Sequence, residues 1–402
     1  MIMEWDALLP SDAPPAGDMA AIFELLERPG VLSFAGGLPD TARFRTAQIA
    51  AAGTEVLTRH GPESLQYSPS PGFRWFREFL SERLARRGIP AAPAELVVTA
   101  GSSQAFDLVC RAMLRPGDHV LVESPTFLGA LATLRLFPVT VHGVPVDEEG
   151  LSVDQLADAL RRLRRQGVRP RFLYTIPNFQ NPTGCTLTEP RRRELVRLAA
   201  EWGLPLLEDD AYGELGEGAP LPALKALHPA GVVFLGTFSK IFAPGLRLGW
   251  LAGPPELAQR VVGIRQSTDQ CPSSFAQFLA RACDAAGILD GQIEDIRTAL
   301  RRLRTATLDA LARHMPEEAR WTRPDGGYYT WVTLPPPLDA GKLLPEVVEQ
   351  QRVAYVPGAA FYPEPADGRR QLRLSYSLVE AAQIPDGIAR LGTVFRSALS
   401  AG

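Results

Sequence analysis

Short apolar runs alternate with longer segments of helical periodicity between about residue 46 and residue 290. A run of roughly 4–8 apolar residues bounded by turn residues predicts a buried strand, whereas helical spacing of apolar residues predicts a helix. Because this alternation is typical of parallel sheets covered on both faces, we predict an α/β fold: a three-layer α/β/α arrangement around a mostly parallel sheet. The predicted strands are 96–99, 119–123, 139–144, 172–176, 205–208, 232–235 and 249–252, and the helices between them include 103–113, 153–165 and 189–202.

The pattern differs near the two ends of the chain. Residues 1–18 are predicted to form an arm, and apolar residues at helical spacing predict a short helix over 19–26. After residue 290, an arginine-rich helix is predicted to run to His314, and alternating strands then surround a helix at 339–350. This segment indicates a smaller α+β domain. The predicted division is an arm and part of the small domain at 1–45, a large domain at 46–290 and a small C-terminal domain at 291–402.

The composition is that of an ordinary globular chain of 402 residues, with 46% hydrophobic and 22% charged residues. A net charge of −3 gives no electrostatic reason to bind nucleic acid or a membrane, and no apolar run approaches the ~18 residues of a membrane-spanning helix. The N-terminus is acidic and interrupted by proline, so we expect no secretory signal and a cytoplasmic location. The cysteines and histidines show no metal-binding spacing, so we expect free thiols and no metal.

The stretch 232–251 holds the first candidate for chemistry. A predicted strand ends there, and the hydroxyls of Thr237 and Ser239, the amine of Lys240 and the guanidinium of Arg247 follow it. Apolar neighbours reduce the solvation of an ammonium group and favour the neutral amine, which is a nucleophile toward an aldehyde. Hydroxyls and an arginine suit a phosphate. The stretch is therefore compatible with a Schiff base to pyridoxal phosphate, although a lysine in such a position, taken alone, is more often an ordinary surface lysine.

Other predicted strands also end in polar or aromatic residues, at the sheet edge where α/β proteins bind ligands. The turn and helix start at 101–104 suit a phosphate, and Phe127 suits stacking on a flat ring. The amide of Asn181 suits an oxyanion, Asp209 suits a protonated ring nitrogen, and Tyr212 suits a phenolate oxygen. Each of them alone also has an ordinary interpretation as a helix cap, a core aromatic residue, a turn or a paired carboxylate.

Nine motifs together resemble one family, the fold type I pyridoxal-phosphate-dependent aminotransferases of class I and II. The similarity is to the branch shared by 2-aminoadipate aminotransferases and the effector domains of MocR-type regulators. The motifs occur in the order of that family over residues 31–377, and they are FAGGLPD, LQYSPSPG, TAGSSQAFD, SPTFLGA, PNFQNPTG, EDDAY, GTFSK with PGLRLGW, RPDGGYYTW and LRLSYS. The resemblance implies a homodimer that binds pyridoxal 5'-phosphate.

The resemblance also implies a role for each matched residue. Lys240 would be the Schiff-base lysine and the acid/base of the reaction, and Asp209 would pair with the ring nitrogen. Asn181 and Tyr212 would bond the phenolate oxygen, and Phe127 would stack on the ring. The phosphate would be held by Ser102, Ser103, Gln104, Thr237, Ser239 and Arg247, and by Tyr67 of the partner subunit; Arg373, Asn181 and Gly37 would bind the substrate, with Arg373 clamping its α-carboxylate.

The substrate side chain is less constrained by the sequence. An enzyme specific for a long dicarboxylate needs a cation for the distal carboxylate, and the predicted helix near the N-terminus contains no Arg or Lys. Met19, Phe23 and Phe34 favour an apolar or aromatic pocket, so we expect aromatic or aliphatic donors, with 2-aminoadipate-like donors left open and 2-oxoglutarate as acceptor.

Two alternatives to transamination remain. The same residues would also serve elimination or oxidation of an amino acid on the same cofactor. A ligand-sensing regulatory domain is disfavoured, because only about 30 residues precede FAGGLPD, too few for a winged helix-turn-helix.

Overall fold

The computed structural model describes residues 18–401, and its largest element is an eight-stranded sheet. In order across the sheet, the strands are β2 (Leu96–Thr99), β9 (Gly249–Ala252), β8 (Val232–Thr237), β7 (Leu206–Asp210), β6 (Leu173–Thr175), β3 (His119–Ser124), β4 (Thr140–Asp147) and β5 (Gly150–Leu151). The pairs from β8 to β4 are parallel, whereas β9 is antiparallel to both of its neighbours and β5 is antiparallel to β4. Every strand predicted from the sequence is present, and the mostly parallel sheet is confirmed.

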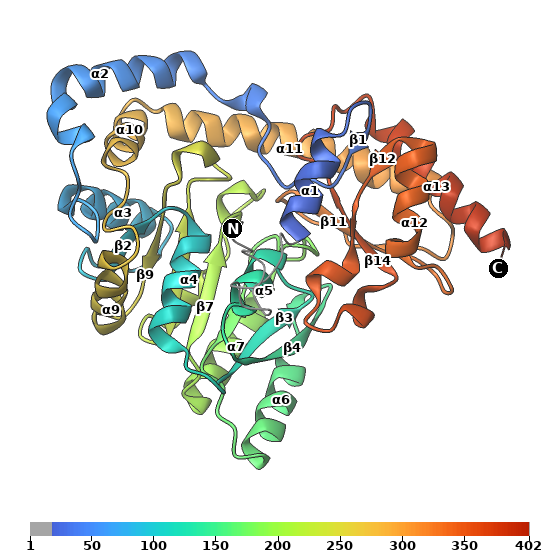
Figure 1. Cartoon of the computed structure of the whole chain (residues 1–402), viewed down its shortest axis with the longest axis horizontal. Helices are drawn as coiled ribbons and strands as arrows, with labels where there is room; N and C mark the ends of the chain where they lie inside the picture. Colours follow the sequence, from blue (N-terminus) through green and yellow to red (C-terminus); the bar gives the residue numbers. More distant parts are fainter. Residues whose placement is uncertain (1–17, 402) are drawn as a thin grey trace, which may run out of the picture.

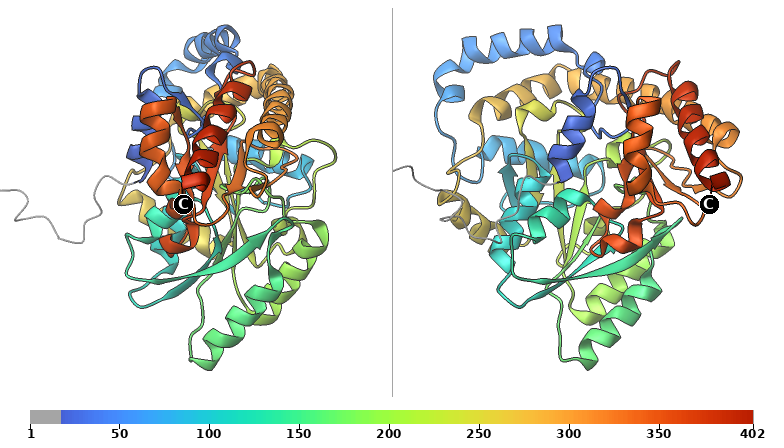
Figure 2. Two further views of the ribbon diagram at one scale, coloured as in Figure 1. Left: turned by 90° about the vertical axis from the view of Figure 1, so that its right-hand side faces the viewer. Right: turned by 45° about the vertical axis from the view of Figure 1, so that its right-hand side comes forward.

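Side chains of the central strands point alternately to the two faces of the sheet, and both faces are apolar. In β8, Val233 and Leu235 belong to one buried cluster, whereas Val232 and Phe234 pack on the opposite face. Helices cover both faces and complete the three layers (Figures 1 and 2). The first face is covered by α4 (Ser102–Met113), α5 (Leu128–Leu134) and α9 (Pro255–Gln266), and the second by α6 (Val153–Arg165), α7 (Glu189–Trp202), α8 (Leu224–Leu227), α3 (Arg74–Arg86) and α10 (Ser274–Ala285).

Strand β7 ends in three consecutive buried carboxylates and extends two residues beyond its predicted end. The prediction ended at Glu208, because buried acidic side chains are rare unless they have partners. In the structure Glu208 accepts hydrogen bonds from two backbone amides at the start of α8, and Asp210 pairs with Arg87. Asp209 lies between them in the chain and points to the opposite face. The strand therefore continues because each neighbour of Asp209 has its own partner.

A second sheet is formed mainly by the C-terminal part of the chain. Its antiparallel strands are, in order, β10 (Arg320–Trp321), β11 (Tyr329–Thr333), β14 (Gln371–Ser375) and β13 (Val356–Pro357). Helices α12 (Ala340–Glu346), which continues as a π-helix over Val347–Gln351, and α13 (Ile384–Ala401) belong to the same part of the molecule. Strand β1 (Leu32–Ser33) pairs with β12 (Val353–Ala354), which attaches the N-terminal segment to this part. Short 3-10 helices occur at Thr41–Arg43, Gly213–Leu215, Pro244–Leu246, Gly358–Phe361 and Pro365–Gly368.

Helix α11 (Ile288–His314) joins the two sheets and runs through the predicted domain boundary at residue 290. Its first half packs with the large sheet through Ile293 and Leu300, and its second half packs with the small sheet through Ala310 and Leu311. The helix is continuous because both halves bury an apolar face, each against a different core. The division of the chain into domains stays a prediction.

The N-terminal segment contributes two helices. Helix α1 (Asp18–Glu27) matches the predicted helix and lies near α5, whereas residues 1–17 of the predicted arm lie outside the described part (Figure 1). Helix α2 (Thr46–Leu65) bends at His60, two residues before Pro62, and packs against α10. Among residues 18–401, no helix combines the length and apolar composition needed to cross a membrane.

Candidate active site

A cavity of about 340 Å³ lies at the carboxyl ends of the large-sheet strands, where the small sheet and α1 approach them. This volume and position are typical of small-molecule sites in α/β proteins. The structure brings most of the predicted site residues into its lining, but not Gln104 or Tyr67. Those in the lining are Gly37, Ser102, Ser103, Phe127, Asn181, Asp209, Tyr212, Thr237, Ser239, Lys240, Arg247 and Arg373.

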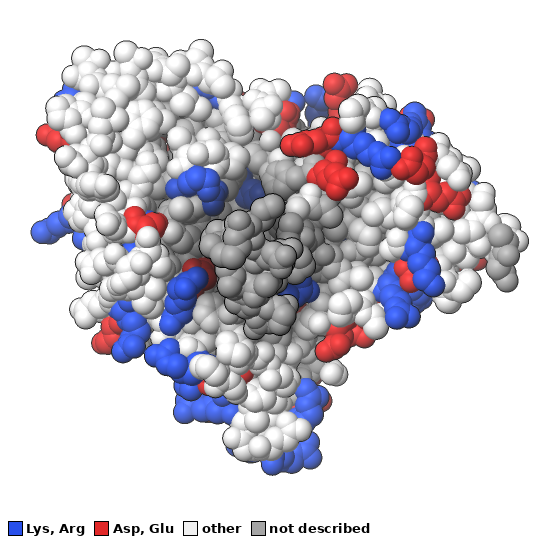
Figure 3. All heavy atoms as spheres, viewed as in Figure 1, with Lys and Arg blue, Asp and Glu red and all other residues white. Residues whose placement is uncertain are grey.

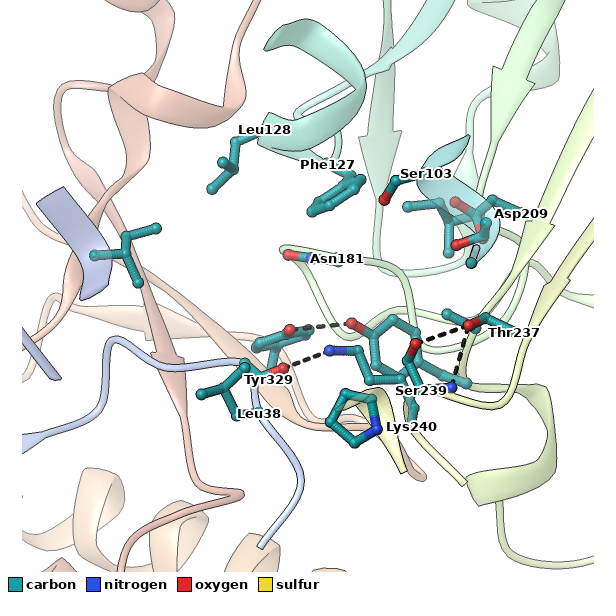
Figure 4. Close-up of a pocket in the computed structure, with 18 of the residues that line it drawn as sticks. Leu38, Ser103, Phe127, Leu128, Asn181, Asp209, Thr237, Ser239, Lys240 and Tyr329 are labelled. Atoms are coloured by element: carbon teal, nitrogen blue, oxygen red, sulfur yellow. Dashed lines mark hydrogen bonds between the residues drawn. The ribbon is translucent and has the colours of Figure 1, made fainter. Parts of the chain in front are cut away.

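Lys240 follows the end of β8 and extends into the cavity, across from Phe127 in the view of Figure 4. Its Nζ donates a hydrogen bond to the Gly37 carbonyl oxygen at 2.6 Å. Burial, together with the positive charges of Arg373 and Arg247, lowers the pKa of Lys240 to about 8. At pH 7 roughly a tenth of this side chain is therefore the neutral, nucleophilic amine, far more than in an ordinary lysine.

Asp209 offers one unpartnered oxygen to the cavity. Its Oδ2 accepts a hydrogen bond from the Tyr174 hydroxyl at 2.7 Å, whereas the buried Oδ1 accepts none within 3.5 Å from the described residues; the Ser102 hydroxyl is close enough to act on the pKa of the carboxyl and lowers it. Burial raises the pKa of Asp209 to about 7, and the nearby Asp210 acts in the same direction. A cation placed against Oδ1 would restore the ionised form. This orphaned carboxylate oxygen fits the protonated ring nitrogen of pyridoxal phosphate.

The turn between β2 and α4 has the features of a phosphate-binding site. Gly101 has φ +117°, a backbone conformation that favours glycine, and the guanidinium of Arg247 lies close to it, since a Cβ there would be 2.9 Å from Nη2. Helix α4 has no side-chain cap, so its first amide groups are available to an anion. The hydroxyls of Thr237 and Ser239, 2.9 Å apart, complete this side of the cavity. The residues present fit a phosphate group.

The side chain of Gln104 is directed away from the cavity and supports the turn from behind. Its Oε1 accepts a hydrogen bond from the Ala100 amide at 2.7 Å, and its Nε2 donates to Asp269 at 2.7 Å. Asp269 in turn pairs with the buried Arg265 at 2.9 Å. Both polar ends of the Gln104 side chain are thus occupied by protein groups, so it braces the turn instead of reaching the cavity.

Arg373, in β14, is a buried cation with no carboxylate partner in residues 18–401. It donates to Oδ1 of Asn181 and to the Ala35 carbonyl oxygen, both at 2.8 Å, and its Nε has no partner among the described residues. The rings of Tyr329 and Phe361 pack against its guanidinium at 4.4 and 4.9 Å. A buried guanidinium is favoured when an anion joins it. Arg373 is therefore suited to a carboxylate that enters the cavity.

The loop that carries Asn181 is held by buried polar contacts. Gln180 donates to Glu123 at 3.0 Å and to the Pro125 carbonyl oxygen at 2.7 Å, and it accepts from the Thr183 amide at 2.9 Å. Burial raises the pKa of Glu123 to about 7. These contacts fix the loop and hence the amide of Asn181 beside Arg373.

Tyr212 is accompanied by a second tyrosine that the sequence prediction missed. The hydroxyls of Tyr212 and Tyr329 lie 3.0 Å apart, and both residues line the cavity (Figure 4). Burial raises the pKa of Tyr212 well above its usual value, so this phenol keeps its proton. Tyr329 belongs to the motif RPDGGYYTW, but nothing in that motif shows which of its two tyrosines faces the site. Tyr174, which binds Asp209, was also missed, because its position in an apolar run predicts only a core residue.

One side of the cavity, which we call the apolar wall, consists of Ile22, Leu26, Leu38 and Leu128. In the part of the lining that the structure describes, the basic residues are limited to Lys240, Arg247 and Arg373. An apolar wall of the kind predicted is therefore present, and Phe34 is not part of it. Phe34 is fully buried in the core of the small sheet, and the side chains of Met19 and Phe23 lie outside the described part.

Comparison with known proteins places this site in a family. Residues 30–391 match the family described as aminotransferase class I and II. Aromatic-amino-acid aminotransferase 1 of Thermococcus litoralis is 38% identical over 384 residues, which cover 95% of this chain and 92% of the relative. A 2-aminoadipate transaminase of Thermus thermophilus is 39% identical over 391 residues, which cover 96% and 95% of the two chains.

A solved structure agrees with these sequence relatives. The α-aminoadipate aminotransferase of Thermus thermophilus, in complex with N-(5'-phosphopyridoxyl)-L-leucine, is 38% identical, with a TM-score of 0.90 and coverage of 100% of both chains. The similarity therefore extends over both sheets and the cavity between them. The chain belongs to the class I and II aminotransferases, and it is a pyridoxal-phosphate-dependent aminotransferase of fold type I.

Proposed function

We propose that this aminotransferase moves the amino group of an aromatic or aliphatic amino acid to a 2-oxo acid, with Lys240, Asp209 and Arg373 as its central residues. The observation that carries the proposal is the pairing of Arg373, a buried cation without an anion, with the apolar wall in one cavity. An α-amino acid with an apolar side chain has a carboxylate to pair with Arg373 and a hydrophobic group to contact the apolar wall.

Pyridoxal phosphate, when bound, supplies an electron sink that stabilises negative charge on the substrate Cα. The neutral amine of Lys240 would hold the cofactor and then accept and return the proton at Cα. Asp209 would bind the ring nitrogen through its free Oδ1, and Tyr212 would donate to the phenolate oxygen. The phosphate would be held by Ser102, Ser103, Thr237, Ser239 and Arg247, with Gln104 supporting the turn from outside.

Arg373 would bind the substrate α-carboxylate through two of its N–H groups, with Asn181 fixing the guanidinium. The acceptor in this proposal is 2-oxoglutarate, whose α-carboxylate would use the same arginine. Relatives named for aromatic amino acids and for 2-aminoadipate leave two donor classes to choose between. The first 27 residues contain no Lys or Arg, and the apolar wall adds none, which favours the aromatic or aliphatic donor.

We further propose a homodimer in which Tyr67 reaches the phosphate of the partner's cofactor. Tyr67 does not line the cavity of its own chain, and its side chain is 76% exposed. Leu57 and Leu65 of the adjacent helix α2 are also exposed, and few charged side chains lie over α2 on the face shown in Figure 3. Exposed apolar residues grouped on one helix are typical of a surface that pairs with another copy.

The proposed donor class is tested with a panel of the twenty amino acids, each with 2-oxoglutarate as acceptor. We expect aromatic and large aliphatic donors to have the highest kcat/KM, and a preference for 2-aminoadipate or glutamate would overturn the proposed donor class.

A second assay, which tests the type of reaction, omits the acceptor. Transamination converts one equivalent of donor per active site to its oxo acid and leaves the amino group on the cofactor. Release of ammonia in this assay would instead support elimination or oxidation.

A further inference from the structure

Tyr329, the first residue of β11, contacts three residues with proposed roles in the site. Its side chain is 1% exposed. The guanidinium of Arg373 lies 4.4 Å from its ring, and the ring of Tyr212 meets it edge-on, with centroids 5.7 Å apart and planes at 81°. The two hydroxyls are within hydrogen-bond distance, at 3.0 Å (Figure 4). Tyr329 therefore lies between the group that binds the carboxylate and the group that faces the cofactor.

The backbone around Tyr329 is shaped to hold the hydroxyl in this place. A Cβ on Gly37 would lie 2.0 Å from the Tyr329 hydroxyl oxygen, so the hydroxyl uses space that only glycine leaves open. At the other end, Gly184 has φ +73°, and a Cβ there would lie 2.4 Å from the Tyr329 carbonyl oxygen. Two glycines from distant parts of the chain thus allow one tyrosine to fit, and its hydroxyl has little freedom to move.

Each of the two hydroxyls carries one proton, and only one of these protons can lie in the hydrogen bond that joins the hydroxyls. Among residues 18–401, neither hydroxyl has another hydrogen-bond partner. If Tyr212 donates to Tyr329, then the proton of Tyr212 is not available to a ligand. If Tyr329 donates to Tyr212, the proton of Tyr212 is free to point into the cavity. The direction of this one hydrogen bond decides which tyrosine serves as a donor.

We infer that Tyr329 is a positioning residue whose hydroxyl donates a hydrogen bond to the hydroxyl oxygen of Tyr212. The proton of Tyr212 is then left to form a hydrogen bond with the phenolate oxygen of the bound cofactor. This inference rests on the proposed function, which assigns Tyr212 to that oxygen. A hydroxyl that accepts one hydrogen bond is a stronger donor in the next, because the two bonds polarise each other. Tyr329 thereby strengthens the hydrogen bond from Tyr212 to the phenolate oxygen, although Tyr329 itself does not contact that oxygen.

The inference is tested by the pH titration of the near-visible absorbance of the bound cofactor in the full-length enzyme. A donor at the phenolate oxygen stabilises its negative charge and moves this titration to lower pH. Tyr329→Phe removes one oxygen atom and keeps the ring, and we expect the midpoint to rise by about half a pH unit. Tyr212→Phe should raise it further, by about one unit or more.

A matched control and a double variant separate the outcomes. Tyr376→Phe removes another buried hydroxyl, one that donates to the Gly326 carbonyl oxygen and does not line the cavity, and it should leave the midpoint unchanged. The double variant should match Tyr212→Phe alone, because Tyr329 acts through Tyr212. A shift in Tyr212→Phe without one in Tyr329→Phe would overturn the inference and leave the proposed function intact. Additive shifts would overturn it too, and no shift in any variant would remove Tyr212 from its proposed role as well.

Discussion

The cavity has two walls that differ in how they are built. The strand-end wall carries Asp209, Thr237, Ser239 and Lys240, which lie in or directly after β7 and β8 in the middle of the large sheet. The apolar wall comes from α1, α5 and a loop, and it presents methyl and methylene groups only. The strand-end wall can place polar atoms accurately, because buried strands fix their backbone. The apolar wall can distinguish ligands only by size, which is worth about 1–3 kcal/mol for each methylene.

Two buried polar groups of the cavity lack a hydrogen-bond partner among residues 18–401. They are Oδ1 of Asp209, in the strand-end wall, and Nε of Arg373, in the small sheet. Arg192 shows how a buried arginine looks when its role is structural. It donates to the carbonyl oxygens of Leu187, Pro222 and Pro177 and to Asn178. Other buried polar atoms of the described residues also lack partners, Nε of Arg83 and Oε1 of Gln371 among them, but those residues do not line the cavity. An unfilled donor or acceptor therefore indicates a binding group only where it also faces a cavity.

The largest effect should come from Lys240→Ala, which removes the nucleophile of the strand-end wall. We expect kcat for transamination to fall by about 10³-fold or more, because both covalent attachment and proton transfer at Cα are lost. Borohydride reduction followed by peptide mass spectrometry should find the cofactor on Lys240 in the parent enzyme and on no residue in the variant. Covalent attachment at another lysine would show that Lys240 is wrongly assigned.

Arg373→Ala should have the next largest effect, and it separates a binding arginine from a structural one. Truncating one partner of a desolvated charge pair costs about 2–5 kcal/mol, so kcat/KM should fall by roughly 30- to 4000-fold. The midpoint of thermal unfolding should fall less than in the control, because Arg373 donates to only two protein acceptors and its burial without an anion is itself unfavourable. Arg192→Ala, the control, should lower that midpoint strongly, since it leaves several buried carbonyl oxygens without donors. An unaltered half-reaction in Arg373→Ala would exclude this residue from the site.

The sequence was sufficient to predict the strands of the large sheet and most of the cavity lining. The apolar runs are short, both faces of the sheet are buried, and polar residues follow the strands directly in the chain. The positions of Lys240 and Asp209 follow from local order alone, because parallel strands end at one edge of the sheet. For the same reason, the resemblance of nine motifs to one family could be transferred residue by residue.

The remaining features depend on contacts between distant segments. The side chain of Gln104 points away from the cavity because Asp269, 165 residues later in the chain, accepts a hydrogen bond from its amide group. Tyr329 reaches Tyr212 because β11 pairs with β14 and because Gly37 leaves room for its hydroxyl. Phe34 is absent from the apolar wall because it packs into the core of the small sheet. Neither hydrophobic periodicity nor motif spacing contains this information, since each contact is made only when the two sheets are in place.

A cation added to the apolar wall should change donor preference with a smaller effect. Ile22→Arg places a guanidinium on α1, where Ile22 lines the same cavity as Arg373. We expect the ratio of kcat/KM for 2-aminoadipate over leucine to rise about tenfold or more, because the new guanidinium would pair with the distal carboxylate of 2-aminoadipate. Ile22→Met keeps the wall apolar and should leave the ratio within about twofold. An unchanged ratio in Ile22→Arg would show that the substrate side chain does not point toward α1.

The smallest effect concerns stability, and it compares two adjacent carboxylates of β7 in the cofactor-free protein. Burial raises the pKa of Asp209 to about 7, so its ionisation destabilises the fold increasingly as pH rises from about 4 to 7, and fully above 7. Burial also acts to raise the pKa of Asp210, but the Arg87 guanidinium holds it below its usual value, so ionised Asp210 stabilises the fold.

Replacement by asparagine should therefore act in opposite directions at the two positions. Asp209→Asn still accepts the Tyr174 hydroxyl and should raise the unfolding midpoint of the cofactor-free protein by about 2–5 °C at pH 8, with a smaller gain at pH 5.5. Asp210→Asn should lower the midpoint at both pH values, because Arg87 loses its charged partner. Calorimetry of the two variants and the parent at both pH values measures this. A loss of stability in Asp209→Asn at pH 8 would mean that Asp209 is already satisfied without the cofactor, and the strand-end wall would then have no unfilled acceptor for the ring nitrogen.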